Sequence, residues 1–175
     1  MRQILTWLGF EPMAAAEDDD TVRRIADELD RLEPARARYV AAFAYILSRV
    51  ARADQDVSPT ETAAMERLVV EKGGLPPDQA IIVVQMAKTQ HLLFGGTADY
   101  SVTREFARIA SREQKLALID CLFAVSASDD AILTVEDNEI VRVARELKVE
   151  HADVVRLRGA YRQHLAASRG LGDQT

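Results

Sequence analysis

The sequence predicts an all-α protein, a helical bundle built from two similar helix-turn-helix halves. Residues that favour strands are scarce, since aromatic residues make up 6% of the 175 residues. Alanine, leucine, arginine and glutamate, which favour helices, are abundant. A pattern of apolar and acidic residues also recurs after 75 positions. Recurrence at a fixed interval indicates a duplicated structural unit.

Eight apolar-periodic stretches separated by turn residues predict eight helices. Pro34 opens the second and Gly73 closes the third. Pro77 opens the fourth, and Gly95 and Gly96 end it, because proline suits the first helical position and glycine the residue after the last. The predicted helices span residues 20–32, 35–53, 59–72, 77–93, 101–110, 112–128, 135–148 and 151–168.

The chain divides into a short N-terminal part and one folded domain. The sequence of residues 1–19 predicts a short helix followed by a flexible acidic linker. Residues 20–170 are expected to form a single helical domain. The opening MRQILTWLGF is too short for a signal peptide. Trp7 and Phe10 leave two interpretations open, docking of this segment on the domain or a weak contact with a membrane surface.

The composition excludes several classes of protein. Lysine and arginine number 22 against 28 aspartates and glutamates, which gives a net charge of −6 and no basic footprint for nucleic acid. The longest apolar runs fall far short of the roughly 20 residues of a transmembrane segment. Cytoplasmic localisation is therefore expected. The single cysteine, Cys121, excludes a disulfide framework and predicts a small buried hydrophobic residue.

The repeat aligns residues 38–72 with residues 113–147. In each unit an apolar helix is followed by an aspartate, an aliphatic residue three positions later, and a glutamate seven positions after the aspartate. Asp54 aligns with Asp129, and Glu61 with Glu136. The side chains expected to form the core of both units are Phe43, Leu47, Val50, Leu68, Leu118, Leu122, Val125, Val143 and Leu147.

The two turns carry the candidate metal ligands. Asp54 lies at the C-terminal end of its helix, where the helix dipole disfavours an anion. Carboxylates gathered there need a cation or the N-terminus of the next helix, and oxygen ligands suit calcium, magnesium or manganese. The stretch is not an EF-hand, because Pro59 and Met65 occupy the positions of its glycine and last glutamate. The candidate ligands are Asp54, Asp56, Glu61, Asp129, Asp130 and Glu136.

Helix capping is the alternative interpretation of the same residues. Ser58-Pro59-Thr60-Glu61 matches a capping box, in which serine and glutamate bond each other's backbone amides. In the second turn Thr134 and Asp137 predict a box shifted by one position. That box would leave Glu136 outside it, so capping alone would not explain why the interval from Asp to Glu recurs.

The paired turns, and above all SDDAILTVEDNEIVRVARELKVEHADVV (128–155), resemble the tellurite-resistance TerB family and its TerB-like relatives. The family pattern matches Asp129, Ile132, Glu136 and Asp137 at or next to these positions. The glycine usual after each aspartate is replaced, in the second turn by Asp130. The resemblance covers about residues 38–160. It implies an all-α bundle of two similar halves, with acidic residues that chelate metal.

Several functions remain open at this stage. The first is a non-enzymatic module that binds protein partners, with divalent cations at the two turns. The resemblance places it in a tellurite or stress response, within an assembly peripheral to the inner membrane. The second is a metal-free structural bundle that binds partners. The third is an enzyme, either a metal-dependent hydrolase or a tellurite reductase, but His91, His151 and His164 lie far apart and no paired thiols exist.

Overall fold

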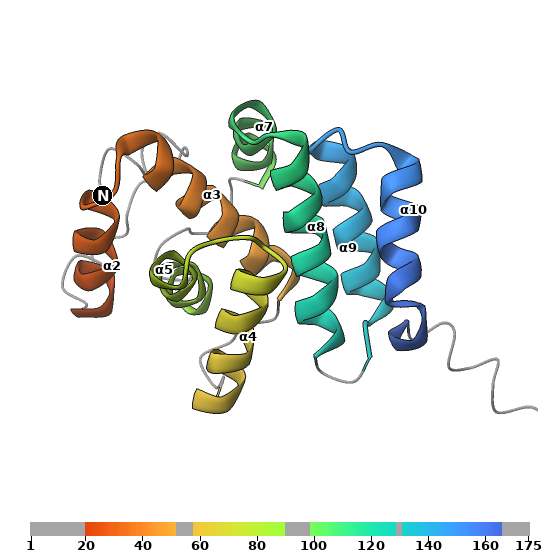
Figure 1. Ribbon diagram of the computed structural model, residues 1–175, viewed down its shortest axis with the longest axis horizontal. Coiled ribbons are helices and arrows are strands. Elements are labelled where there is room, and N and C mark those ends of the chain that lie inside the picture. The colour runs from red at the N-terminus through yellow and green to blue at the C-terminus, as the bar shows by residue number, and fades with distance from the viewer. Residues whose placement is uncertain (1–19, 52–57, 90–98, 129–130, 166–175) are drawn as a thin grey trace, which may run out of the picture.

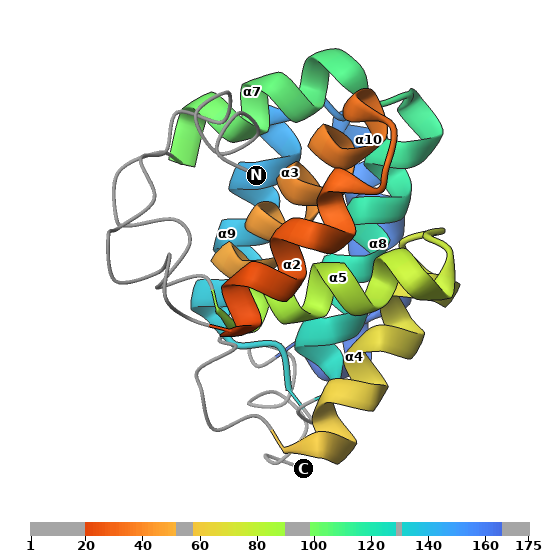
Figure 2. The same ribbon diagram turned by 90° about the vertical axis from the view of Figure 1, so that its left-hand side faces the viewer.

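The protein is all-α, as the sequence predicts (Figures 1 and 2). The computed structural model describes residues 20–51, 58–89, 99–128 and 131–165. Within these ranges no strand forms, apart from an isolated parallel bridge between Ile132 and Leu165. The helices are α2 (Asp20–Asp30), α3 (Pro34–Val50), α4 (Pro59–Glu71), α5 (Pro77–Lys88), α7 (Asp99–Ile109), α8 (Arg112–Ala127), α9 (Thr134–Glu146) and α10 (His151–Ala160).

All eight predicted helices are present, but three of them end at least three residues earlier than predicted. Helix α3 ends at Val50 instead of residue 53, because Ala51 adopts an extended backbone with ψ of 118°. Helix α5 ends at Lys88 instead of residue 93. The hydroxyl of Thr89 there donates a 2.8 Å hydrogen bond to the Gln85 carbonyl, which also accepts one of 3.1 Å from the Thr89 amide. The prediction that Gly95 and Gly96 end this helix is wrong.

The last helix is also shorter than predicted. Helix α10 ends at Ala160 instead of residue 168, and Tyr161 turns the chain into a single 3-10 turn at Arg162–His164. Leu165 is then extended and forms the bridge to Ile132. The Ile132 amide donates a 2.7 Å hydrogen bond to the carbonyl of His164. This pairing holds the end of the domain against the turn before α9.

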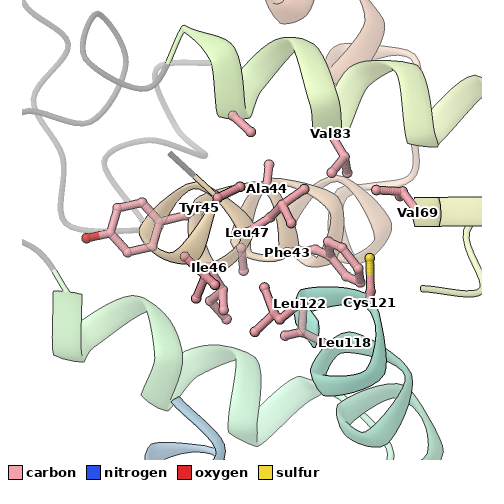
Figure 3. Close-up of a cluster of buried hydrophobic side chains, with 14 of the residues drawn as sticks. Phe43, Ala44, Tyr45, Ile46, Leu47, Val69, Val83, Leu118, Cys121 and Leu122 are labelled. Carbon is pink, nitrogen blue, oxygen red and sulfur yellow. The ribbon is translucent and has the colours of Figure 1, made fainter. Parts of the chain in front are cut away.

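Helix α3 is the centre of the molecule. Every residue from 39 to 48 is buried, and α3 contacts α2, α5, α7, α8 and α9. Three of those ten residues are alanines, namely Ala41, Ala42 and Ala44, and Ala37 of the same helix is buried as well. Small side chains let neighbouring helices approach closely. Figure 3 shows the side chains of α3 packed against helices on several sides.

The predicted core is confirmed for eight of its nine side chains. Those eight are buried, and Leu68 is partly buried and packs against the same core. Cys121 is buried too, as predicted, and lies beside Phe43 (Figure 3). Burial raises the pKa of the Cys121 thiol to about 12, so it is neutral at physiological pH.

An aromatic cluster joins α3 and α7 in the core. Tyr39 stacks on Phe106 with ring centroids 5.2 Å apart, and Phe43 meets Phe106 edge to face. Gly73, after α4, lies so close that a Cβ there would be 2.8 Å from Phe43 Cζ and 2.5 Å from the Val69 carbonyl oxygen. No larger residue fits at this position without moving α3 or α4.

The two proposed repeat units share several features. Helices α4 and α9 each have 13 residues and begin 75 positions apart. Each is followed by a residue with left-handed backbone, Gly74 with φ of 68° and Lys148 with φ of 57°. The contacts between units are reciprocal, since α3 packs on α9 and α4 on α8. Within the units α8 packs closely on α9, whereas α3 packs chiefly on α5 and α7. Superposition of residues 38–72 on 113–147 stays a prediction.

No described helix is long and apolar enough to cross a membrane. The apolar residues of α3 and α8 face other helices of the bundle instead.

The Leu122→Ala variant tests the assignment of the core. Leu122 is fully buried in α8, so the variant should lose about 2–5 kcal/mol of unfolding free energy through lost burial and a residual cavity. Urea denaturation followed by circular dichroism measures the loss. Val155→Ala is the control, because this α10 valine is 55% exposed. Equal stability of the two variants would show that the α8 face is wrongly assigned.

Candidate functional site

The structure places two of the six predicted metal ligands. Asp54, Asp56, Asp129 and Asp130 lie outside the described residues. Glu61 lies in the first turn of α4 and Glu136 in the first turn of α9. Both helices begin at the lower end of the molecule in Figures 1 and 2. The helices that carry Glu61 and Glu136 thus begin toward the same end of the bundle.

Glu61 forms the predicted capping box with Ser58. The Ser58 amide donates a 2.7 Å hydrogen bond to Glu61 Oε2, and the Glu61 amide donates one of 3.2 Å to Ser58 Oγ. Pro59 occupies the first helical position, where a missing amide proton costs nothing. Hydrogen bonding to Ser58, first through its side chain and then through its backbone, lowers the pKa of Glu61. Its carboxylate is therefore charged at neutral pH.

Glu136 makes the same capping contact in the second turn. The Leu133 amide donates a 2.8 Å hydrogen bond to Glu136 Oε2, so Glu136 is the third residue of α9 as Glu61 is of α4. Leu133 has no side-chain acceptor, and the box is half complete. The prediction that Thr134 and Asp137 form a shifted box is wrong, because α9 begins one residue earlier than predicted.

Asp137 is free of the cap and bonds across the bundle instead. Arg158 of α10 donates two hydrogen bonds to it, from Nε to Oδ1 at 2.8 Å and from a terminal nitrogen to Oδ2 at 2.7 Å. Such paired contacts are strong and directional. The bond to Asp137 raises the pKa of Arg158. Arg158 therefore links α10 to the start of α9.

Capping explains the glutamate of both turns. Each of the two glutamates holds the backbone amide that begins its helix, and a carboxylate is favoured there by the helix dipole. They differ in burial, since Glu136 is 8% exposed and Glu61 is fully exposed. In the part of the chain that the structure describes, no group of three histidine, cysteine, aspartate or glutamate side chains could hold a metal ion. A metal site would need the aspartates outside the described ranges.

A buried charge network joins α3, α7 and α9. Arg49, near the end of α3, has a side chain that is 5% exposed. Its Nε donates a 2.9 Å hydrogen bond to Glu139 Oε1, and another guanidinium nitrogen donates one of 2.9 Å to Glu146 Oε2. The Thr103 hydroxyl donates a 2.7 Å hydrogen bond to the same Glu146 oxygen. Arg142 reaches both carboxylates from the solvent side of α9.

The pKa values of this network follow from its pairing. Burial opposes the charge on Glu146, but hydrogen bonds from Arg49 and Thr103 outweigh it and lower the pKa of Glu146. Burial likewise opposes the charge on Arg49, and the bonds to Glu146 and Glu139 outweigh it and raise the pKa of Arg49. Both groups stay charged at neutral pH. The network positions α9, and with it the second acidic turn, against α3.

Sequence reasoning missed this network. Glu139, Arg142 and Glu146 follow one another at three and four positions, which is the spacing of one helix face. That pattern was visible, but it is equally typical of an exposed face. Arg49 stands in an apolar run without an acidic neighbour in sequence, and its partners lie 90 and 97 positions away.

A second polar contact ties α8 to its neighbours. The Tyr161 hydroxyl donates a 2.8 Å hydrogen bond to Asp120 Oδ1, and the Lys72 ammonium lies 3.6 Å from Asp120 Oδ2. Burial, together with the hydrogen bond to Asp120, raises the pKa of Tyr161. Its ring stacks on Phe123 with centroids 5.8 Å apart. These contacts join the end of α4, the middle of α8 and the end of α10.

The cysteine thiol and the described histidines belong to different elements. The Cys121 thiol is buried and neutral, and its sulfur is 3.8 Å from the Leu68 carbonyl oxygen. His151 begins α10, whereas His164 lies in the 3-10 turn after that helix, and His91 is outside the described residues. The described side chains thus offer no thiol paired with a base.

Comparison with known proteins finds one family. The family model described as tellurite resistance protein TerB matches residues 39–159. This range runs from the first turns of α3 to the last turn of α10 and includes both acidic turns. The chain matches no curated protein and no solved structure.

The Arg49→Ala variant tests the buried network. Removing the guanidinium leaves Glu139 and Glu146 facing a buried space without their main partner, which should cost about 3–5 kcal/mol of unfolding free energy. Arg49→Lys should cost less, since it keeps the charge but loses the paired geometry. Denaturation in urea measures both variants.

The matched control is Arg108→Ala, which removes an exposed arginine paired with Glu105 one helical turn away. Its stability should equal that of the wild type within error, because exposed pairs contribute little. If Arg49→Ala behaves like Arg108→Ala, the network does not hold α9 in place.

Proposed function

Because the chain belongs to the tellurite-resistance TerB family, we propose that it is a non-enzymatic module that binds a protein partner and takes divalent cations at its two acidic turns. It acts in a tellurite or stress response, in the cytoplasm, within an assembly close to the inner membrane. The observation that carries this proposal is the family match over residues 39–159, which spans both acidic turns.

The chemistry of the described interior supports a binding role over a catalytic one. The largely buried charges of Arg49 and its partners Glu139 and Glu146 are engaged with one another and join α3 to α9. The one thiol has a pKa raised to about 12, so it is not an activated nucleophile. These features favour a rigid scaffold. The metal-dependent hydrolase and the reductase are the weaker alternatives, and a turnover assay with a generic phosphoester or with tellurite would reveal them.

The caps support cation binding by holding one carboxylate in each turn. Glu61 and Glu136 are bound at the third position of their helices through one oxygen each. A carboxylate has two oxygens, and the second can serve a cation such as calcium or manganese. Asp54 and Asp129 stand seven residues earlier in the chain. With Asp56 and Asp130 they supply the remaining oxygen ligands of the proposal.

Glutamine variants separate ligation from capping. Gln114 of α8 accepts a 2.8 Å hydrogen bond from the Ser111 amide in a complete capping box of this same chain. Glutamine can therefore replace the capping function of glutamate while it removes the charge that a hard cation needs. The informative variant combines Glu61→Gln with Glu136→Gln.

Calorimetric titration with calcium, and separately with manganese, tests the cation proposal. The wild type should bind, and the double glutamine variant should bind more weakly at nearly unchanged thermal stability. The variant with Asp54→Asn and Asp129→Asn should lose binding, because it removes a charged ligand from each turn. The matched control is Glu113→Gln, at an exposed glutamate in the first turn of α8, which should bind as the wild type does.

Absence of binding by the wild type would reject the cations and leave the metal-free bundle that binds partners. Affinity capture from an extract of the source cells, with and without the cation, then tests the partner. A protein that wild type captures and the Asp54→Asn, Asp129→Asn variant loses supports a cation-tuned module. If the wild type and this variant capture the same proteins, the cation does not tune partner binding.

A further inference from the structure

Residues of α2 and α5, which contact each other, line a groove. Both helices lie on the side of the molecule that faces the viewer in Figure 2. The groove has a volume of about 580 Å³. From each helix it is lined by residues spaced three or four apart, such as Thr21, Arg24 and Glu28 of α2 and Asp78, Ile81 and Gln85 of α5. That spacing is one face of a helix, so the groove runs along both helices.

The floor of the groove is apolar. Ile25 of α2 and Ile82 of α5 are 4% and 6% exposed and belong to the core. Ile81 stands beside them and is 49% exposed. It is one of the few large apolar side chains in the described ranges that solvent reaches. An apolar strip between two helices is the kind of surface that receives a third amphipathic helix.

We propose that residues 3–10 of this same chain occupy this groove as a short amphipathic helix. Ile4, Trp7 and Leu8 are spaced at three and four positions and would form one apolar face. Gln3 and Thr6 fall on the other face. Docking would cover Ile81 with the indole of Trp7 or its neighbours. The proposal goes beyond the family module, whose match begins at residue 39.

The length of chain before α2 suits this docking. Helix α2 begins at Asp20, directly before Thr21, which lines the groove. The nine residues 11–19 can span roughly 30 Å when extended, enough to return the segment to the groove. The lining runs from Thr21 to Arg31, roughly 15 Å of helix, and eight residues of helix measure roughly 12 Å. The tether also gives the segment a high effective concentration at the groove.

Charge favours the same occupant. Asp27 and Asp78 line the groove, and the described structure shows no ion pair for either. Arg24 and Arg31 also line the groove, and Arg31 pairs with Glu28 at 2.5 Å, so the lining has three carboxylates against two arginines. Arg2 directly precedes the docking segment and is the one basic side chain among residues 1–19. Its positive charge complements the excess of one carboxylate in the groove lining.

Fluorescence of the full-length protein tests the proposal, because Trp7 is the only tryptophan in the chain. Docked Trp7 should emit at a shorter wavelength than in urea and be less accessible to acrylamide. Ile81→Glu should move the emission to longer wavelength and raise quenching, while Ile81→Ala should have a smaller effect. The control is Val155→Glu, a substitution at a similarly exposed residue of α10, which should change neither.

Circular dichroism melting confirms that each variant is folded, which is expected because both substituted side chains are exposed. The emission should not depend on protein concentration, since the docking is intramolecular. Three results would overturn the proposal: Trp7 as accessible in the wild type as in urea, equal effects of Ile81→Glu and Val155→Glu, or a blue shift seen only with added anionic vesicles. Emission that shifts with protein concentration would assign the groove to a second copy and overturn it as well.

Discussion

Helix α3 has almost no face toward solvent, and the rest of the domain is arranged to bury it. Its residues 39–48 are all buried, and five other helices pack on it. An amphipathic helix needs cover on one side, but an apolar helix such as this needs cover all round. One neighbouring helix would cover only one side of α3. The fold therefore requires helices from both halves of the chain to pack around it.

This burial explains the one charged side chain in the second half of α3. An unpaired buried guanidinium would be strongly destabilising. Arg49 therefore needs carboxylate partners on a helix that packs against α3. It finds them on α9, whose Glu139 and Glu146 face the bundle, and Thr103 of α7 completes the bonding of Glu146. Helix α9 is thereby fixed in rotation and position. Its first turn, with Glu136 as the cap, is fixed with it.

The sequence predicted the helices, their core faces and the first capping box, because each depends on residues close together in the chain. It misplaced the ends of α3, α5 and α10, where one hydroxyl bond or one extended residue ends a periodic pattern. It missed the role of Glu136 because Leu133 is not a residue that predicts a cap. It missed the partners of Arg49 because they are set by packing and lie far along the chain. The predicted aspartate ligands lie outside the described residues.

Native-state hydrogen exchange measured by NMR tests the central position of α3 most directly. Amides of residues 40–47 should exchange only through global unfolding, because opening α3 requires the removal of all five neighbours. Helix α2 has substantial contacts with α3 and α5 only. Its amides should therefore exchange through smaller openings. Exchange of the α3 amides at a lower free energy than those of α8 would contradict the account.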